Sequence, residues 1–392
     1  MHKFIFFYIS FFFIIFSLYS CNTNKEKKEQ HNNDIYTFKK QGIKSFLLDS
    51  VTAPHSTCIQ YLENFFLAEK QADFLATLNM NDNSIIFYDY EIGSMKSKIK
   101  FFKEGEQGVG SIFGFSIINQ DSILIHRYHG MQLYLVNSKA QVLKSYKLSS
   151  DNFPFSVFPA STSNPINKIH NYVYMNSDGK LDPNNAKVDL KGIVACIDIN
   201  TGKIVPKLYY PEIYKIGIWT PEFLTSYHTP PLFKEQVVFS FPIIDSIYVT
   251  DYNDYVGKYY AGSKFQNSPI KPLSTQLGSG LPPYEQREKY RLSQLYYGAI
   301  YYDEFQKYYY RFCFLPISES DYVSGVPLKS KEQKVSIIIL DSSFNKVGEV
   351  DLEAYKYNPY MVFINKNGLH IALKANGNED NLIFEIFKVV KK

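Results

Sequence analysis

The side chains best suited to chemistry in this 392-residue chain are an arginine, a tryptophan and several histidines, each set among aromatic residues. Arg311 lies in the run YYYRFCF, where alternation along a strand places Tyr309, Arg311 and Cys313 on one face. A guanidinium group in this setting could line a channel and bind an anion or a sugar, or it could pack on the neighbouring rings. Both interpretations stay open, and Tyr309 and Arg311 are candidate ligand-contacting residues.

Two further pairs are candidates for a ligand or partner surface. Trp219 in GIWTPEF and His228 in SYHTPP lie between two groups of predicted strands, where an exposed tryptophan could stack on a sugar ring or a peptide. A buried tryptophan would instead fill the space between neighbouring sheets. Arg127 and His129 in HRYHG are expected at a rim or a turn, and His129 is a poor metal partner for His126 because residues three apart on a strand point to opposite faces.

The common signatures of enzymes and cofactor sites are missing from the sequence. It contains no G-x-x-x-x-G-K-[ST], no H-E-x-x-H and no G-x-S-x-G motif. Gly105, Gly108 and Gly110 have the wrong spacing for a dinucleotide-binding loop and predict a turn. The run DYNDYVG resembles a calcium loop, but its twelfth position is Gly262 and not glutamate. We therefore expect no metal and no cofactor, and assign no catalytic residue.

Cysteine usage argues against redox or zinc chemistry. The chain has four cysteines and no C-x-x-C motif. Cys196 and Cys313 lie inside strand-like runs and are expected to be buried, inert thiols, since a free cysteine packs as a small apolar residue.

The N-terminus has the pattern of an export signal. Lys3 precedes an apolar run from Phe4 to Leu18, which is short for a membrane-spanning helix of about 20 residues. The segment LYSC resembles the bacterial lipobox, with Tyr19 departing from its preference for small residues. This resemblance implies a signal peptide over residues 1–20, lipid attachment at Cys21, and a place in the cell envelope, at the outer membrane. An uncleaved anchor helix is the alternative.

Residues 21–40 are interpreted as a flexible tether, because the polar stretch from Asn22 to Asp34 has no large apolar residue to bury. Residues 41–392 then form one domain.

The formal net charge of +4 is small for this length and no basic block is present, so nucleic acid is not an expected partner. The membrane is an expected partner, because the lipid at Cys21 would attach the chain to it.

The remainder of the chain predicts an all-β fold. It contains 33 Tyr and 32 Phe, and aromatic residues favour strands. Short strand-like runs separated by turn residues recur at regular intervals, which is typical of a six-bladed β-propeller. Seven blades or a pair of β-sandwiches are the alternatives. The six groups of strands are Phe74–Phe102, Ser122–Leu148, His170–Tyr210, Gln236–Tyr260, Gly298–Leu352 and Tyr360–Val390.

The last group offers only three strands, so we expect Ile43–Asp49 to complete it and close the ring. Long insertions interrupt the pattern, and one of them should contain a short helix after Pro283. Long loops in a propeller tend to crowd one rim, which makes a pocket there the expected site. These insertions are Asn152–Asn171, Asn176–Lys191, Ala261–Gln294 and Ser318–Gln333.

The segment YYGAIYYDEFQKYYYRFCFLPI (Tyr296–Ile317), together with the lipobox and the six strand groups, resembles a Bacteroidetes-type lipoprotein family, domain of unknown function 4221. Members of that family resemble TolB-like six-bladed propellers. The family has no established activity, so the resemblance implies an architecture and a cellular location but no mechanism.

Two functions fit these features. The first is a non-enzymatic binding or scaffold module that presents one rim to a protein or glycan partner in the envelope. The second is a hydrolase or lyase that acts on extracellular polysaccharide. A glycosidase generally needs two carboxyl groups that flank the scissile bond, so a pair of carboxylates at the channel would favour the enzyme. We favour the binding module.

Overall fold

The computed structural model describes residues 34–392, apart from residues 68, 128, 151–152, 154–155, 178–179, 182–187, 190, 233–234, 277–280, 319–331, 376 and 378. The predicted signal peptide, Cys21 and most of the predicted tether lie outside the described residues. Among the helices of the described part, none is long and apolar enough to cross a membrane.

Six antiparallel sheets of four strands each form the body of the protein. Blade 1 contains β2 (Ile59–Leu67), β3 (Lys70–Asn79), β4 (Ser84–Asp89) and β5 (Met95–Lys100). Blade 2 contains β6 (Gly114–Asn119), β7 (Ser122–Arg127), β8 (Gln132–Val136) and β9 (Val142–Lys147). Blade 3 contains β10 (Asn167–Ile169), β11 (Tyr172–Asn176), β14 (Lys191–Asp198) and β15 (Ile204–Tyr209).

The second half of the chain repeats this arrangement. Blade 4 contains β16 (Tyr227–His228), β17 (Val237–Ser240), β18 (Ser246–Thr250) and β19 (Tyr255–Tyr260). Blade 5 contains β20 (Tyr296–Asp303), β21 (Tyr308–Phe314), β22 (Val335–Leu340) and β23 (Lys346–Asp351). Blade 6 contains β24 (Tyr357–Asn365), β25 (Gly368–Leu373), β26 (Asn381–Lys391) and, from the other end of the chain, β1 (Tyr36–Leu47).

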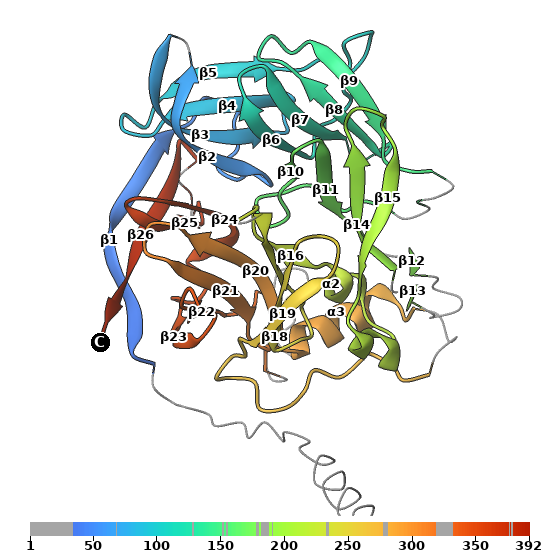
Figure 1. The fold of residues 1–392 in the computed structure, drawn as a ribbon. Coiled ribbons are helices and arrows are strands. Elements are labelled where there is room, and N and C mark those ends of the chain that lie inside the picture. Colours follow the sequence, from blue (N-terminus) through green and yellow to red (C-terminus); the bar gives the residue numbers. More distant parts are fainter. Residues whose placement is uncertain are drawn as a thin grey trace, which may run out of the picture. The chain divides into compact units, whose positions relative to one another are not determined.

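The blades follow one another around a ring (Figure 1). The first strands of neighbouring blades contact each other, β2 with β6 and β24, and β20 with β16 and β24, so the first strand of each blade is the innermost. This confirms the predicted six-bladed β-propeller, and the alternatives of seven blades or two sandwiches do not hold. The sequence groups had missed inner strands, among them β2, β6 and β16.

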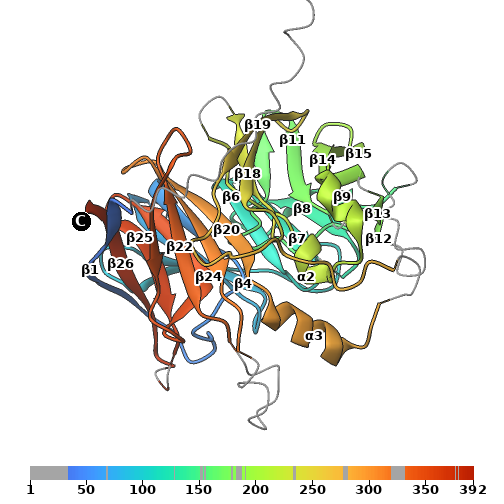
Figure 2. The same cartoon turned by 90° about the horizontal axis from the view of Figure 1, so that it is seen from below.

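Strand β1 closes the ring as the outer strand of blade 6. It pairs with β26 in antiparallel register from Tyr36 opposite Lys391 to Leu47 opposite Asn381, with a bulge at residue 41. The two ends of the domain lie side by side in Figures 1 and 2. The predicted closure by the segment at Ile43 is confirmed, but the strand begins at Tyr36. The predicted tether boundary at residue 40 is therefore too late, because residues 36–40 already belong to blade 6.

The core lies between the blades, because each sheet is covered on both faces by its neighbours. Strand β4 is buried along its whole length, and β22 is buried at every position after Val335. Such strands read as continuous apolar runs and not as an alternation of apolar and polar residues. Aromatic side chains fill much of this space, for example Tyr174 stacked on Tyr252 with ring centroids 3.9 Å apart.

The two ends of the blades differ in the length of their connections. In a four-stranded antiparallel blade, the hairpins between strands 1 and 2 and between strands 3 and 4 lie at one end, which we call the short-hairpin face. The connections between strands 2 and 3 and from one blade to the next lie at the other end, the long-connection face. All four predicted insertions fall on the long-connection face.

Three helices and a small hairpin also belong to these long connections. They are η2 (Glu212–Ile216), α2 (Pro221–Leu224), α3 (Tyr284–Ser293) and the pair β12 (Lys180–Leu181) and β13 (Val188–Asp189). Helix α3 begins directly after Pro283, as predicted, since proline is tolerated where a helix starts. It lies apart from the sheets in Figure 2. The long-connection face thus carries these additional elements.

Candidate functional site

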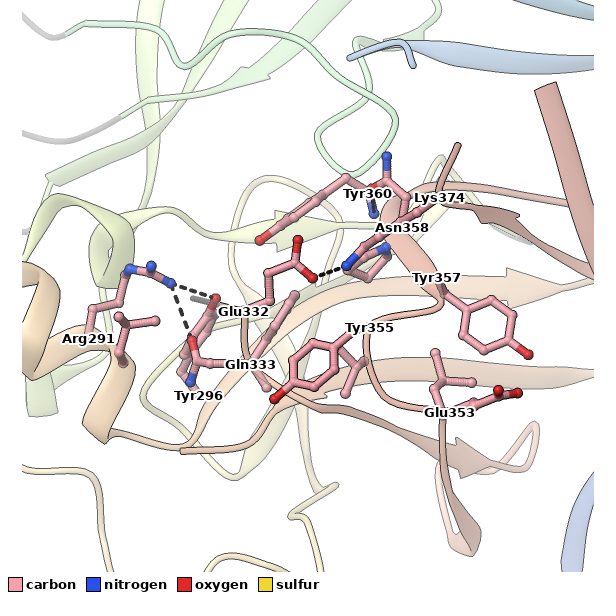
Figure 3. Close-up of a pocket in the computed structure, with 15 residues that line it drawn as sticks. Arg291, Tyr296, Glu332, Gln333, Glu353, Tyr355, Tyr357, Asn358, Tyr360 and Lys374 are labelled. Carbon is pink, nitrogen blue, oxygen red and sulfur yellow. Dashed lines mark hydrogen bonds and ion pairs between the residues drawn. The ribbon is translucent and has the colours of Figure 1, made fainter. Parts of the chain in front are cut away.

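A pocket of about 340 Å³ opens between blades 5 and 6 on the long-connection face (Figure 3). Its volume is at the lower end of the range typical of ligand pockets, roughly 300–1,000 Å³. The lining comes from the end of α3, the ends of β20, β21, β22 and β24 on this face together with the residues just before β22, the connection from β23 to β24, and the residue after β25. The polar and aromatic side chains of this lining are Arg291, Tyr296, Phe314, Glu332, Gln333, Glu353, Tyr355, Tyr357, Asn358, Tyr360 and Lys374.

One wall of the pocket is a column of three aromatic rings. Tyr296 stacks on Phe314 with ring centroids 4.6 Å apart, and Phe314 stacks on Tyr360 at 5.9 Å. Tyr296 is buried, whereas 48% of Tyr360 is exposed. The column therefore begins in the core of blade 5 and ends in an accessible ring at the pocket. The amide oxygen of Asn358 accepts a hydrogen bond from the backbone N–H of Tyr360 at 3.1 Å, which fixes the chain below that ring.

A second accessible ring belongs to Tyr355, in the turn between β23 and β24. Its φ of 61° lies in the left-handed region, which residues other than glycine adopt rarely and at a cost. The turn is held by a hydrogen bond from the N–H of Lys374 to the carbonyl of Lys356 at 3.0 Å. The tyrosine side chain is 57% exposed. The strained turn thus presents an aromatic ring to solvent at the edge of the pocket (Figure 3).

Arg291 forms the corner of the pocket on the side of α3. Its Nε and Nη2 donate to the two carboxylate oxygens of Glu288 at 3.1 and 2.9 Å, one turn earlier on the helix. Its Nη1 donates to the Tyr296 hydroxyl at 3.4 Å and to Oε1 of Gln333 at 3.3 Å. Burial alone would lower the pKa of Arg291, but the bond to Glu288 outweighs it and the pKa is raised. The guanidinium group is therefore charged and already engaged on three nitrogens.

The other charged groups of the pocket are also paired. Lys374 forms an ion pair with Glu332 across the opening. Glu353 lies 2.9 Å from the ammonium group of Lys356 and 3.9 Å from that of Lys40. The bond to Glu353 is the main cause that raises the pKa of Lys356.

Glu385 binds the same two lysines and so connects Glu353, through Lys40, to the closing strand. Its Oε2 lies 3.2 Å from the Lys40 ammonium group and 3.5 Å from that of Lys356, and it accepts a bond from the Tyr357 hydroxyl. Burial alone would raise the pKa of Glu385, but the bonds from Tyr357 and Lys40 lower it. Glu385 is thus held as a carboxylate by Tyr357 and Lys40.

Arg311 lies away from this pocket, in the interior between blades 4 and 5. It is fully buried and donates to Ser240 Oγ at 2.9 Å and to three backbone carbonyls of blade 4 and its connections. Its guanidinium group also lies 3.8 Å from the ring centre of Tyr297. Burial lowers the pKa of Arg311 to about 10, so it remains charged at neutral pH. Of the two interpretations, packing on rings is the one that the structure shows.

Trp219, His228 and Tyr309 are also buried, so the prediction that they lie on an exposed surface is wrong. Trp219 has no exposed area and packs against Tyr214 with ring centroids 6.0 Å apart. His228 stacks on Phe239 at 5.2 Å in the inner strand of blade 4, and burial lowers its pKa to about 4. These side chains fill the space between blades, as the alternative interpretation expected.

Arg127 and His129 do lie at the predicted rim, but on blade 2. Arg127 is half-buried and donates from Nη1 to Gln132 at 3.3 Å across the β7–β8 hairpin. His129 is exposed in the turn that follows, and its ring lies 5.3 Å from that of Phe113. The six candidate residues are therefore distributed over blades 2, 4 and 5 and the connection before blade 4, and they do not form one site.

The thiols and acidic groups of the described residues do not form a further candidate site, either for redox chemistry or for a metal ion. Cys58, Cys196 and Cys313 are free and buried, and burial raises the pKa of Cys58 and Cys313 to about 12. Within the described part of the chain, no three His, Cys, Asp or Glu side chains gather where they could hold a metal ion. The pocket between blades 5 and 6 is therefore our candidate site.

Sequence reasoning missed the residues of this pocket, although it predicted the rim on which they lie. Arg291 comes from the predicted short helix and Gln333 from the end of a predicted insertion. Tyr355 comes from the short connection into blade 6 and Tyr360 from β24, and nothing in their spacing distinguishes them from the many other tyrosines. Only the order of the strands could have indicated these residues, since all of them lie on the long-connection face of two adjacent blades, 5 and 6.

Fold and pocket together define a six-bladed propeller with one ligand-sized opening among its long connections. Residues 36–351 match the family described as "Domain of unknown function (DUF4221)", which is most of the domain, and the chain belongs to that family. The resemblance noted in the run from Tyr296 to Ile317 is thereby confirmed.

Solved structures agree with this assignment. A DUF4221 family member from Bacteroides vulgatus superposes with a TM-score of 0.78 at 20% identity, over 92% of this chain and 100% of that one. A protein from Bacteroides fragilis, described as a candidate exported protein, superposes with a TM-score of 0.54 at 13% identity, over 92% and 96% of the two chains. At these identities the likeness shows the fold alone. No curated protein matches the chain.

Proposed function

We propose that this propeller is a non-enzymatic binding module of the cell envelope, and that the pocket between blades 5 and 6 binds a glycan. The observation that carries the proposal is the pair of accessible rings at the pocket, Tyr355 and Tyr360, beside planar polar groups. The negative face of an aromatic ring attracts the polarised C–H groups on the apolar face of a sugar. The amide nitrogen of Asn358 is a planar donor of the kind that hydroxyl groups bond.

The carboxylates of the pocket favour binding over hydrolysis. A glycosidase of the usual kind needs one carboxyl group that can hold a proton and a second one across the scissile bond. Glu332 and Glu353 are the acidic side chains in the described lining, and each is already engaged in an ion pair with a lysine instead of facing the other across the pocket. The polysaccharide hydrolase or lyase is therefore the weaker hypothesis.

The proposal includes lipid attachment at Cys21, which would place the domain on the outer membrane. The described chain begins at the short-hairpin face. There the N–H of Ile35 donates to Val347 at 3.0 Å, and the N–H of Lys392 donates to the carbonyl of Ile35 at 2.9 Å. The pocket lies on the opposite face. A chain tethered at the short-hairpin face would thus keep the pocket available to a partner.

Replacing Tyr360 by alanine tests the binding role. We expect Tyr360→Ala, and Tyr355→Ala to a lesser extent, to weaken binding to a panel of oligosaccharides at least tenfold, because stacking area is lost at the pocket. Isothermal titration calorimetry measures the affinity, and thermal unfolding should change by less than a few degrees.

Tyr209→Ala is the matched control, because Tyr209 is 56% exposed but lies on the outer strand of blade 3. This control should bind as the parent protein does. Unchanged affinity in both pocket variants, or absence of binding to every oligosaccharide tested, would refute the proposed function.

A further inference from the structure

We infer that the pocket selects an uncharged saccharide and discriminates against acidic ones such as uronates and sulfated sugars. This inference rests on the proposed glycan-binding function and deepens it by naming the class of ligand. It follows from the way in which the charges around the pocket are paired with one another.

The arginine corner has little capacity left for an anion. A carboxylate or sulfate is usually bound by the fork of an arginine through two parallel N–H···O bonds. In Arg291 that fork is occupied by Glu288, which is only 6% exposed and accepts from Nε and Nη2. An acidic sugar would have to displace a buried carboxylate of the same helix, and the displaced charge would be left without its partner.

The lysine side of the pocket is neutralised in the same way. Lys374 is paired with Glu332, and the two side chains face each other across the opening in Figure 3. A negative ligand beside Lys374 would also lie beside Glu332, so the attraction and the repulsion would largely cancel. The ammonium group can still donate to a neutral hydroxyl, because it has three N–H donors.

The ion pairs of the lining residue Glu353 belong to a third compensated group. Lys40 and Lys356 stand between Glu353 and Glu385, with the four separations between 2.9 and 3.9 Å. The charged lining residues and their partners therefore amount to four cations and four anions. No charge in this described set is left for an ionic ligand to neutralise.

What the pocket does offer is a stacking surface and neutral hydrogen-bonding groups. The accessible ring of Tyr360 continues the column formed by Tyr296 and Phe314, so that a sugar ring stacked on it would add a further layer. Asn358 can donate from its amide nitrogen while its oxygen holds the chain at Tyr360. These contacts recognise hydroxyl groups and the apolar face of a pyranose, and neither requires charge.

The test compares the affinity of the full chain for neutral and acidic oligosaccharides of matched length. The neutral probes are cellotriose, mannotriose, xylotriose and galactotriose, and the acidic probes are trigalacturonate and a hyaluronan tetrasaccharide. We expect at least one neutral probe to bind at least tenfold more tightly than both acidic ones. The preference should change little between low and physiological salt, because screening weakens only net ionic attraction.

The variant Glu332→Gln makes the test specific to the pairing. It removes the anion beside Lys374 while keeping a side chain of similar size, so the affinity for trigalacturonate should rise at least threefold relative to the affinity for the neutral probe. Glu379→Gln, in the same connection as Lys374 but outside the lining, is the control and should change neither value.

Three outcomes would overturn the inference. If wild-type protein prefers an acidic probe, the selectivity is wrong while the glycan-binding function stands. If Glu332→Gln leaves the affinity for trigalacturonate unchanged, charge pairing is not its cause. If no saccharide of either kind binds, the proposed function fails and the inference fails with it.

Discussion

Arg311 illustrates how a charged side chain becomes part of a propeller's structure. Four hydrogen bonds join it to Ser240 and to three carbonyl groups of blade 4 and its connections, while its own strand belongs to blade 5. All of these groups are buried, so losing the guanidinium group would leave several of them without a partner. An unpaired buried polar group costs about 1–3 kcal/mol.

We therefore expect Arg311→Met to lower the free energy of unfolding by about 3 kcal/mol or more. Arg311→Lys should recover little of this loss, because one ammonium group cannot reach four separate acceptors. Urea unfolding measures the effect. Arg127→Met is the control, since Arg127 is half-buried with one side-chain partner, and it should cost less than about 1 kcal/mol. A cost that small for Arg311→Met would show that the buried bonds are not important for stability.

The sequence at this scale predicted which residues were unusual but not what they do. Alternation along YYYRFCF places Arg311 on a face of its strand, yet both faces of a propeller strand are buried against neighbouring blades. Periodicity therefore cannot separate a channel-lining arginine from one that joins two blades. The partners of Arg311 lie 50 to 71 residues away in the chain, which no local pattern records.

Closure of the ring depends on one element, the strand β1. Its partner β26 ends the chain, so the two strands connect positions that are nearly the whole domain apart in sequence. Lys39 faces Lys388 directly across this pair. Linking these positions by a disulfide would constrain the unfolded chain over a loop of almost the full domain.

We expect Lys39→Cys with Lys388→Cys, once oxidised, to raise the free energy of unfolding by about 5 kcal/mol, because the closed loop is long. The control pair Phe66→Cys with Gln71→Cys spans one hairpin of blade 1 and should add only about 2 kcal/mol. Denaturant unfolding with and without reductant gives both values. Equal gains in the two proteins would mean that β1 does not hold the ring closed.

The elements were predictable where their pattern was long and regular. In blades 1 to 5 the third and fourth strands are separated by short turns, and the missing fourth strand of the last group identified β1. Inner strands were harder to recognise, because β16 has only two residues and β2 contains a bulge after Leu62. A strand of two residues has no period that a sequence could reveal.

The whole molecule has two unlike faces, and the proposed attachment joins one of them to a membrane. The order of strands predicted six blades, and the positions of the insertions predicted one crowded rim. Neither could specify the pocket, which requires α3, the end of β21 and the start of β24 to meet in space. That meeting depends on how blades 5 and 6 pack and not on any one segment.

Lipid attachment is tested at the level of the intact cell. Metabolic labelling with an alkyne palmitate should mark the wild-type protein and not Cys21→Ala, because the proposed acyl chains require that thiol. Cys58→Ala should label as the wild type does, since Cys58 is buried in the folded domain. Equal labelling of wild type and Cys21→Ala would exclude this mode of attachment.

The position of β1 has a mechanical consequence if the chain is anchored in this way. Any drag on the domain would reach it through the tether, and the tether joins the first residues of β1. Tension along that strand would act in shear on all eleven paired positions with β26 at once, from Tyr36 opposite Lys391 to Leu47 opposite Asn381. The same segment that closes the ring would then also be its force-bearing clamp, and rupture would require many hydrogen bonds to break together instead of one after another.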